Sequence, residues 1–67
     1  MSMLKVIEVL AESDTGWEDA AQNAVSQASN SVREVKSIYI KNHDAKVEGG
    51  KIVKYRVNAK ISFLLEE

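Results

Sequence analysis

The 67-residue chain contains no cysteine and no proline, and it has only three glycines and one histidine. Without cysteine, disulfide bonds and thiolate metal sites are excluded. Without proline, nothing interrupts the hydrogen-bonded ladder of an extended strand. A single histidine leaves the serines without a convincing general base, so we predict that the chain is not an enzyme.

Long apolar runs and a strong charge of one sign are also missing. No run approaches the roughly 20 apolar residues of a membrane-spanning helix, and residues 1–5 lack the apolar core of a signal peptide. Nine basic and ten acidic residues give a formal net charge of −1. Such a balance does not support steering toward nucleic acid or membranes, so we expect neither partner. Because the lack of cysteine fits a reducing compartment, we expect a cytoplasmic location.

The strongest pattern that is present lies in residues 53–65, where every second residue is apolar. This alternation predicts a β-strand with one apolar face. A strand of this length would span about 40 Å, and most strands are shorter, with about 3–10 residues. A single small domain has little else to cover such a strand. We therefore predict a homo-oligomer, since subunit contacts can replace the core that a chain this short lacks.

The rest of the chain predicts a strand, a helix and a second strand. Residues 4–10 are β-branched and aliphatic, which favours a strand. Apolar residues at helical spacing, mostly alanine, follow from Trp17 to Val35 and predict a helix with one buried stripe that frays near residues 29–31. Thr15 and Glu18 fit a capping box that would place Thr15 at the N-cap.

The second predicted strand covers residues 35–46, and the Gly49-Gly50 pair predicts a hairpin turn into the long strand, residues 51–65. This order predicts a single α+β domain over residues 1–67, with a three-stranded antiparallel sheet wrapped on one helix (β-α-β-β). The long strand would lie in the centre. One helix of about 27 Å cannot cover both faces of the sheet, and the uncovered face would suit subunit contacts.

Several segments, in this order and spacing, resemble the dodecins, which are small β-α-β-β proteins that assemble as hollow homododecamers. The segments are residues 5–9, 13, 17–21, 32–35, 48–52 and 55–63. The resemblance implies a non-catalytic shell that binds and stores small molecules, such as the flavins FMN or riboflavin, or coenzyme A.

In dodecins a tryptophan of the second strand stacks on the flavin and a glutamine of the third strand holds it. The resemblance places Ser37 and Arg56 at these positions. A serine has no ring face to stack, so the chain is more similar to a non-flavin branch that includes a calcium dodecin. That comparison implies an alternative role as a structural or metal-ion-binding shell, with metal ligands that the sequence does not identify.

Three further residues allow two interpretations each. Arg56 suits an ion pair between subunits, which we favour, or the binding of an anionic ligand. Tyr39 lies on the same strand face as Ser37 and suits a subunit interface better than a replacement stacking position. Trp17 is expected to pack in the core or an interface, and a displaced stacking role is the alternative.

Metal and phosphate sites have weaker support. His43 and Asp44 are adjacent and would point to opposite faces of a strand, so we interpret His43 as a solvated loop residue. Four carboxylates near the helix start lack the spacing of a preformed calcium loop and are expected to complement the helix dipole; they are Glu12, Asp14, Glu18 and Asp19. Gly49-Gly50 is expected to be a turn because no helix follows it.

Overall fold

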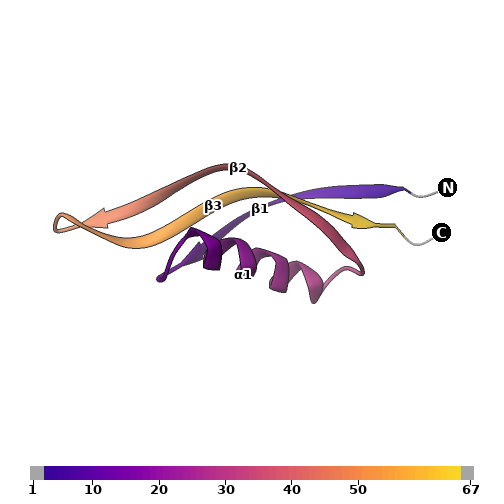
Figure 1. Cartoon of the computed structure of the whole chain (residues 1–67), viewed down its shortest axis with the longest axis horizontal. Helices are drawn as coiled ribbons and strands as arrows, with labels where there is room; N and C mark the ends of the chain where they lie inside the picture. Colours follow the sequence, from indigo (N-terminus) through magenta and orange to yellow (C-terminus); the bar gives the residue numbers. More distant parts are fainter. Residues whose placement is uncertain (1–2, 66–67) are drawn as a thin grey trace.

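The computed structural model describes residues 3–65, so the two terminal residues at each end of the predicted 67-residue domain lie outside the described part. Four elements follow one another in the order β1 (Leu4–Ser13), α1 (Trp17–Ser29), β2 (Val35–Glu48) and β3 (Lys51–Leu64) (Figure 1). The strands form one antiparallel sheet in the order β1-β3-β2. The predicted β-α-β-β architecture with a central long strand is confirmed.

The two outer strands cover different lengths of β3. The β1 pairing ends where Ser13 lies opposite Tyr55, whereas the β2 pairing continues to Glu48 opposite Lys51. Residues 46–54 therefore extend beyond β1 as a two-stranded hairpin, which we call the arm (Figure 1). The arm gives the chain an elongated shape of 52 × 19 × 13 Å.

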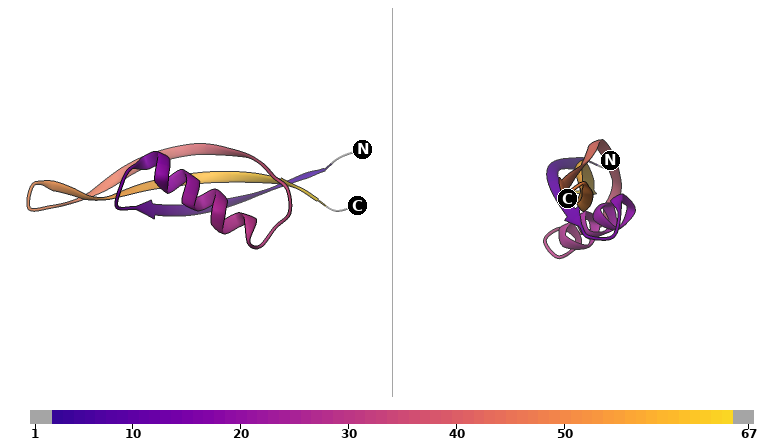
Figure 2. Two further views of the ribbon diagram at one scale, coloured as in Figure 1. Left: turned by 60° about the horizontal axis from the view of Figure 1, so that its bottom comes forward. Right: turned by 90° about the vertical axis from the view of Figure 1, so that its left-hand side faces the viewer.

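The helix lies on one face of the sheet and runs obliquely across the strands (Figure 2). Its alanine stripe is buried, and so are the alternate residues of β3 that face it; the buried apolar residues are Ala20, Ala24, Ala28, Val57, Ala59, Ile61 and Phe63. Side chains as small as alanine let the helix backbone approach the sheet closely. The alternation in the sequence thus identified the buried face of β3 correctly.

The helix ends at Ser29, at the start of the segment predicted to fray, so the apolar spacing beyond it as far as Val35 does not belong to the helix. The amides of Asn30 and Ser31 bond to carbonyls three residues earlier, which tightens the last turn and closes the helix. Glu34 then adopts a left-handed conformation with φ 51°, which turns the chain into β2. Val35 begins β2 and pairs with Phe63, which confirms the predicted start of the second strand.

The predicted capping box is also wrong, because Gly16 is the N-cap and no side chain caps the helix. The hydroxyl of Ser13 organises this turn instead. It accepts a hydrogen bond from the amide of Thr15 at 2.9 Å and donates one to Oδ2 of Asp19 at 2.7 Å. Ser13 is buried, and a buried hydroxyl needs such partners.

Two strands are longer than predicted. The first strand, predicted over residues 4–10, continues to pair with β3 as far as Ser13, which leaves only residues 14–16 between β1 and α1. The charges of Glu12 and Arg56, which lie opposite each other in this extension, favour the pairing. At its far end β2 continues to Glu48, directly before the Gly49-Gly50 turn. Both glycines have positive φ, as the hairpin prediction requires.

Replacing Ser13 with alanine tests the role of this hydroxyl. Ser13→Ala leaves the Asp19 carboxylate and the Thr15 amide without their partner, so we expect a loss of about 1–3 kcal/mol in the free energy of unfolding. Ser26→Ala, at an exposed helix position, is the matched control and should change stability by less than about 0.5 kcal/mol. Chemical denaturation followed by circular dichroism measures both. Equal stability of the two variants would contradict the assignment.

Candidate functional site

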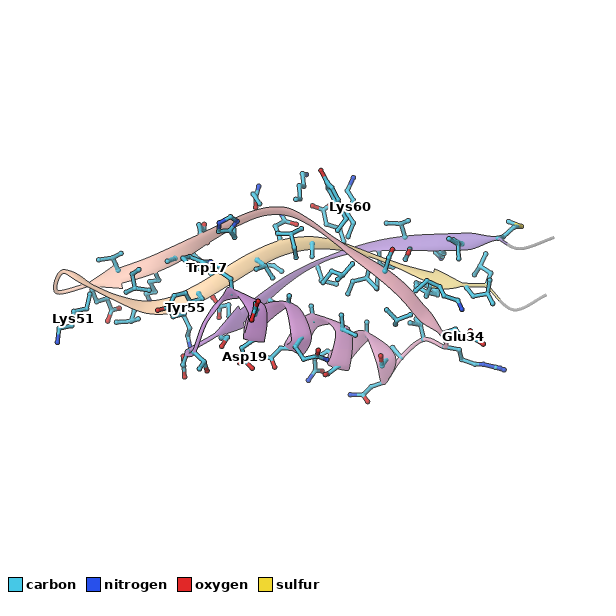
Figure 3. All side chains as sticks on the ribbon, viewed as in Figure 1. Trp17, Asp19, Glu34, Lys51, Tyr55 and Lys60 are labelled. Atoms are coloured by element: carbon cyan, nitrogen blue, oxygen red, sulfur yellow. The ribbon has the colours of Figure 1, made fainter. Side chains whose placement is uncertain are left out.

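The candidate site lies on the face of the sheet that the helix does not cover, which we call the open face. Lys60 points away from the helix on this side (Figure 3). Alternation along each strand assigns further residues to the open face, and three of them are exposed aliphatic side chains of β1: Leu4, Val6 and Leu10. The face therefore combines apolar surface with polar and charged groups, as expected of a contact surface.

The predicted stacking position, Ser37, lies on the open face of β2. Its hydroxyl is 2.5 Å from the hydroxyl of Ser62, the residue opposite it on β3. This position has no ring on which a flavin could stack. The nearest aromatic position on this strand face is Tyr39, which lies opposite Lys60 and whose surface is 64% exposed.

Arg56, the other predicted position, forms an ion pair within its own chain. Its Nε lies 3.0 Å from Oδ1 of Asp44 and its Nη2 lies 3.3 Å from Oδ2 of the same carboxylate. Within one chain the guanidinium thus already has an acidic partner, and the ion pair between subunits that we favoured stays a prediction. A planar guanidinium held in this bidentate way is less available to an anionic ligand.

The fold does not bring the two positions together in one chain. Ser37 pairs with Ser62, and Arg56 lies six residues along the same strand. At about 3.3 Å per residue, the two cross-strand positions are roughly 20 Å apart. A small ligand can therefore contact both kinds of side chain only if they come from different copies.

Sequence reasoning missed Asn58, which lies between Leu10 and Asn42 on the open face. Its Oδ1 atom is buried and has no hydrogen-bond partner among the described residues. A buried carbonyl oxygen of this kind is costly unless a donor reaches it. The sequence offered only a polar residue at an alternate position of a strand, which does not distinguish Asn58 from its exposed neighbours.

Trp17 packs against two rings of the sheet but does not lie in the core, since 37% of its surface is exposed. Its Nε1 donates a hydrogen bond to the carbonyl oxygen of Asp44 at 2.8 Å, and its ring meets His43 and Tyr55 edge-on at centroid distances of 5.2 and 4.9 Å. Figure 3 shows Trp17 and Tyr55 close to the start of the helix, beside the base of the arm. Trp17 thus ties the helix to the hairpin.

His43 is exposed, as the solvated interpretation expected, but it lies within β2 and its ring contacts Trp17, so its placement in a loop is wrong. His43 and Asp44 have the opposite orientations that we expected. The ring of His43 contacts Trp17 on the helix side, whereas the carboxylate of Asp44 binds Arg56 on the open face.

The acidic side chains near the helix start have separate partners. Asp14 accepts a hydrogen bond from Nζ of Lys54 at 2.8 Å, and this bond together with the carboxylate charge raises the pKa of Lys54. Asp19 accepts the bond from Ser13. Within residues 3–65, no group of three or more histidine, cysteine or acidic side chains is placed to hold a metal ion. The same part of the chain contains no helix that is both long and apolar enough to cross a membrane.

Comparison with known proteins gives a consistent picture. The family model described as Dodecin matches residues 3–66. A calcium dodecin from Mycobacterium tuberculosis is 35% identical over 63 residues, which cover 94% of this chain and 89% of the relative. The structure of dodecin from Streptomyces coelicolor superposes with a TM-score of 0.93 at 30% identity, covering 98% of this chain and 94% of the other.

A solved structure of the mycobacterial protein is also similar. It is described as a calcium-chelating immunodominant antigen, a calcium dodecin with a novel calcium-binding site. Its TM-score is 0.83 at 36% identity, and the match covers 97% of this chain and 93% of that one. Sequence and structure agree over nearly the whole length. The chain belongs to the dodecin family.

Proposed function

We propose that the chain forms a hollow homododecameric shell that is not catalytic and that stores or sequesters a small molecule or ion at its subunit contacts. The observation that carries this proposal is the open face, where aliphatic side chains lie exposed on a chain too small to cover them. Membership of the dodecin family supports the same conclusion. A cytoplasmic location is part of the proposal, and the cysteine-free composition supports it.

Within this shell, we propose that flavin is not held by the usual stacking arrangement. The serine pair of Ser37 and Ser62 offers no ring face, so FMN or riboflavin would lose the main contact that the family uses. Coenzyme A remains a candidate ligand at a contact between subunits, because the guanidinium of Arg56 could bind its phosphates. It would have to displace Asp44 from Arg56, which makes this position a poor phosphate site in one chain.

A calcium-binding shell is the second candidate. The 35% identical relative is a calcium dodecin, and three carboxylates lie on strand positions of the open face: Glu8, Glu12 and Asp44. Calcium takes six to eight oxygen ligands, and no described part of a single chain gathers three acidic side chains. We therefore propose that any calcium site draws its carboxylates from more than one copy.

The proposed assembly predicts a mass of about 89 kDa, because the chain itself has a mass of 7.4 kDa and the family forms dodecamers. Light scattering coupled to size exclusion, with fresh protein at micromolar concentration, measures this mass. Val57→Asp places an unpaired charge at a position that is 1% exposed, so it should abolish both folding and assembly. A stable wild-type monomer or dimer would refute the shell.

The proposed loss of flavin stacking predicts weak binding of riboflavin, with a dissociation constant in the micromolar range or above. The double variant Ser37→Trp/Arg56→Gln restores a ring and a neutral amide, and we expect it to bind about ten- to hundredfold more tightly. Quenching of flavin fluorescence measures both constants. Asn42→Trp, which puts a ring elsewhere on β2, should give no such gain. Nanomolar binding by the wild type would show that other residues provide the stack.

The calcium proposal predicts that calcium raises the melting temperature and that a chelator reverses the shift. At a concentration one hundred times the dissociation constant, a ligand that binds only the folded state contributes about 2.7 kcal/mol. Glu12→Gln should reduce the shift if this carboxylate is a ligand, and magnesium at the same concentration controls for ionic strength. Identical melting in calcium and in chelator would remove calcium as the ligand.

A further inference from the structure

The arm presents apolar side chains that nothing in its own chain covers. Val47 is 59% exposed, Ile52 47% and Val53 38%. Val47 and Ile52 pair across the hairpin, so they form one continuous apolar surface near its tip. Lys51, at the turn, points outward at the end of the molecule (Figure 3). Exposed apolar side chains do not stabilise a monomer, and an apolar projection of this kind is typical of a surface that binds a partner.

The same chain contains an unfilled groove between β1 and α1, with a volume of about 760 Å³. Its walls are mainly aliphatic, with polar side chains among them; the lining residues include Ile7, Val9, Leu10, Ala24, Ala28 and Gln27. Because β1 is an edge strand, its outer backbone groups border the groove and are available to an added strand.

An arm cannot enter the groove of its own chain. Lys51 at the arm tip lies five residues along β3 from Arg56, the partner of Glu12, and ten residues from Ile61, the partner of Ile7. These separations correspond to roughly 17 and 33 Å along an extended strand. The two surfaces can therefore meet only between different copies.

We propose that the arm of one copy fills the groove between β1 and α1 of the next copy. This inference rests on the homo-oligomeric shell proposed above and specifies one of its interfaces. Two complementary features support it. The apolar tip matches an aliphatic groove, and the arm carries three lysines against the single carboxylate of Glu48, whereas the groove is lined in part by Glu12. Such a contact joins different surfaces of identical chains, so in a closed shell it generates rings. Apart from its edge at Leu10 and Glu12, which also line the groove, the open face remains free for a separate contact.

Chemical cross-linking tests the proposal directly, because the chain has no native cysteine to interfere. The double variant Ile52→Cys/Gln27→Cys places one thiol on the arm and one on the exposed lining of the groove. A bismaleimide with a short flexible spacer should convert most of the protein into covalent species larger than a dimer on a denaturing gel. In the control Ile52→Cys/Gln22→Cys, the helix thiol lies outside the groove lining, and at least tenfold less product is expected.

Light scattering on the same samples separates the two levels of the proposal. If the Ile52→Cys/Gln27→Cys variant has the mass of the wild-type assembly but gives no cross-linked product, the arm-in-groove contact is overturned and the shell is not. A monomeric wild-type protein would instead refute the shell itself. As an independent check, Val47→Ser/Ile52→Ser removes apolar surface outside the core, so it should fold and assemble at high protein concentration but need at least a tenfold higher concentration than the wild type to do so. Full assembly of this variant at the same concentrations as the wild type would also contradict the contact.

Discussion

The burial of β3 is the constraint on which the rest of the structure depends. Its 14 residues span about 46 Å, whereas the 13 residues of α1 span only about 20 Å. The helix can therefore cover the middle of the strand, where Val57, Ala59 and Ile61 are buried, but not its arm or its opposite face. Both uncovered parts carry exposed aliphatic side chains. The long strand that completes the sheet therefore leaves apolar surface that only other copies can cover.

The same constraint shapes any binding site. Ser37 and Arg56 lie on one face but far apart along β3, and each is already engaged by a neighbour in its own chain. A ligand that contacts both positions needs two copies, and so does a cation that needs several carboxylates. Binding should therefore depend on assembly, which places the chemistry of this chain at subunit contacts instead of in a pocket of the monomer.

The sequence predicted the elements that depend on periodicity. Alternation in β3 and the alanine stripe of α1 are repeated signals, and the Gly49-Gly50 turn is a strong local one, so all three were identified correctly. Features that depend on a single tertiary contact were not. The buried hydroxyl of Ser13, for example, took the place of the predicted Thr15 cap.

The site was less predictable for the same reason. Three register shifts in β2 determine which residue lies opposite which, and no local pattern specifies them. The partner of Arg56 and the hydroxyl opposite Ser37 therefore became evident only in the folded chain.

The central claim is that this chain completes its core only by associating with copies of itself. The most direct test is the melting temperature measured over a hundredfold range of protein concentration, because assembly stabilises the folded state by mass action. We predict that the melting temperature rises with concentration, and that secondary structure and assembly are lost together. A reversible transition at the same temperature at every concentration would show that the monomer is stable by itself and would contradict the claim.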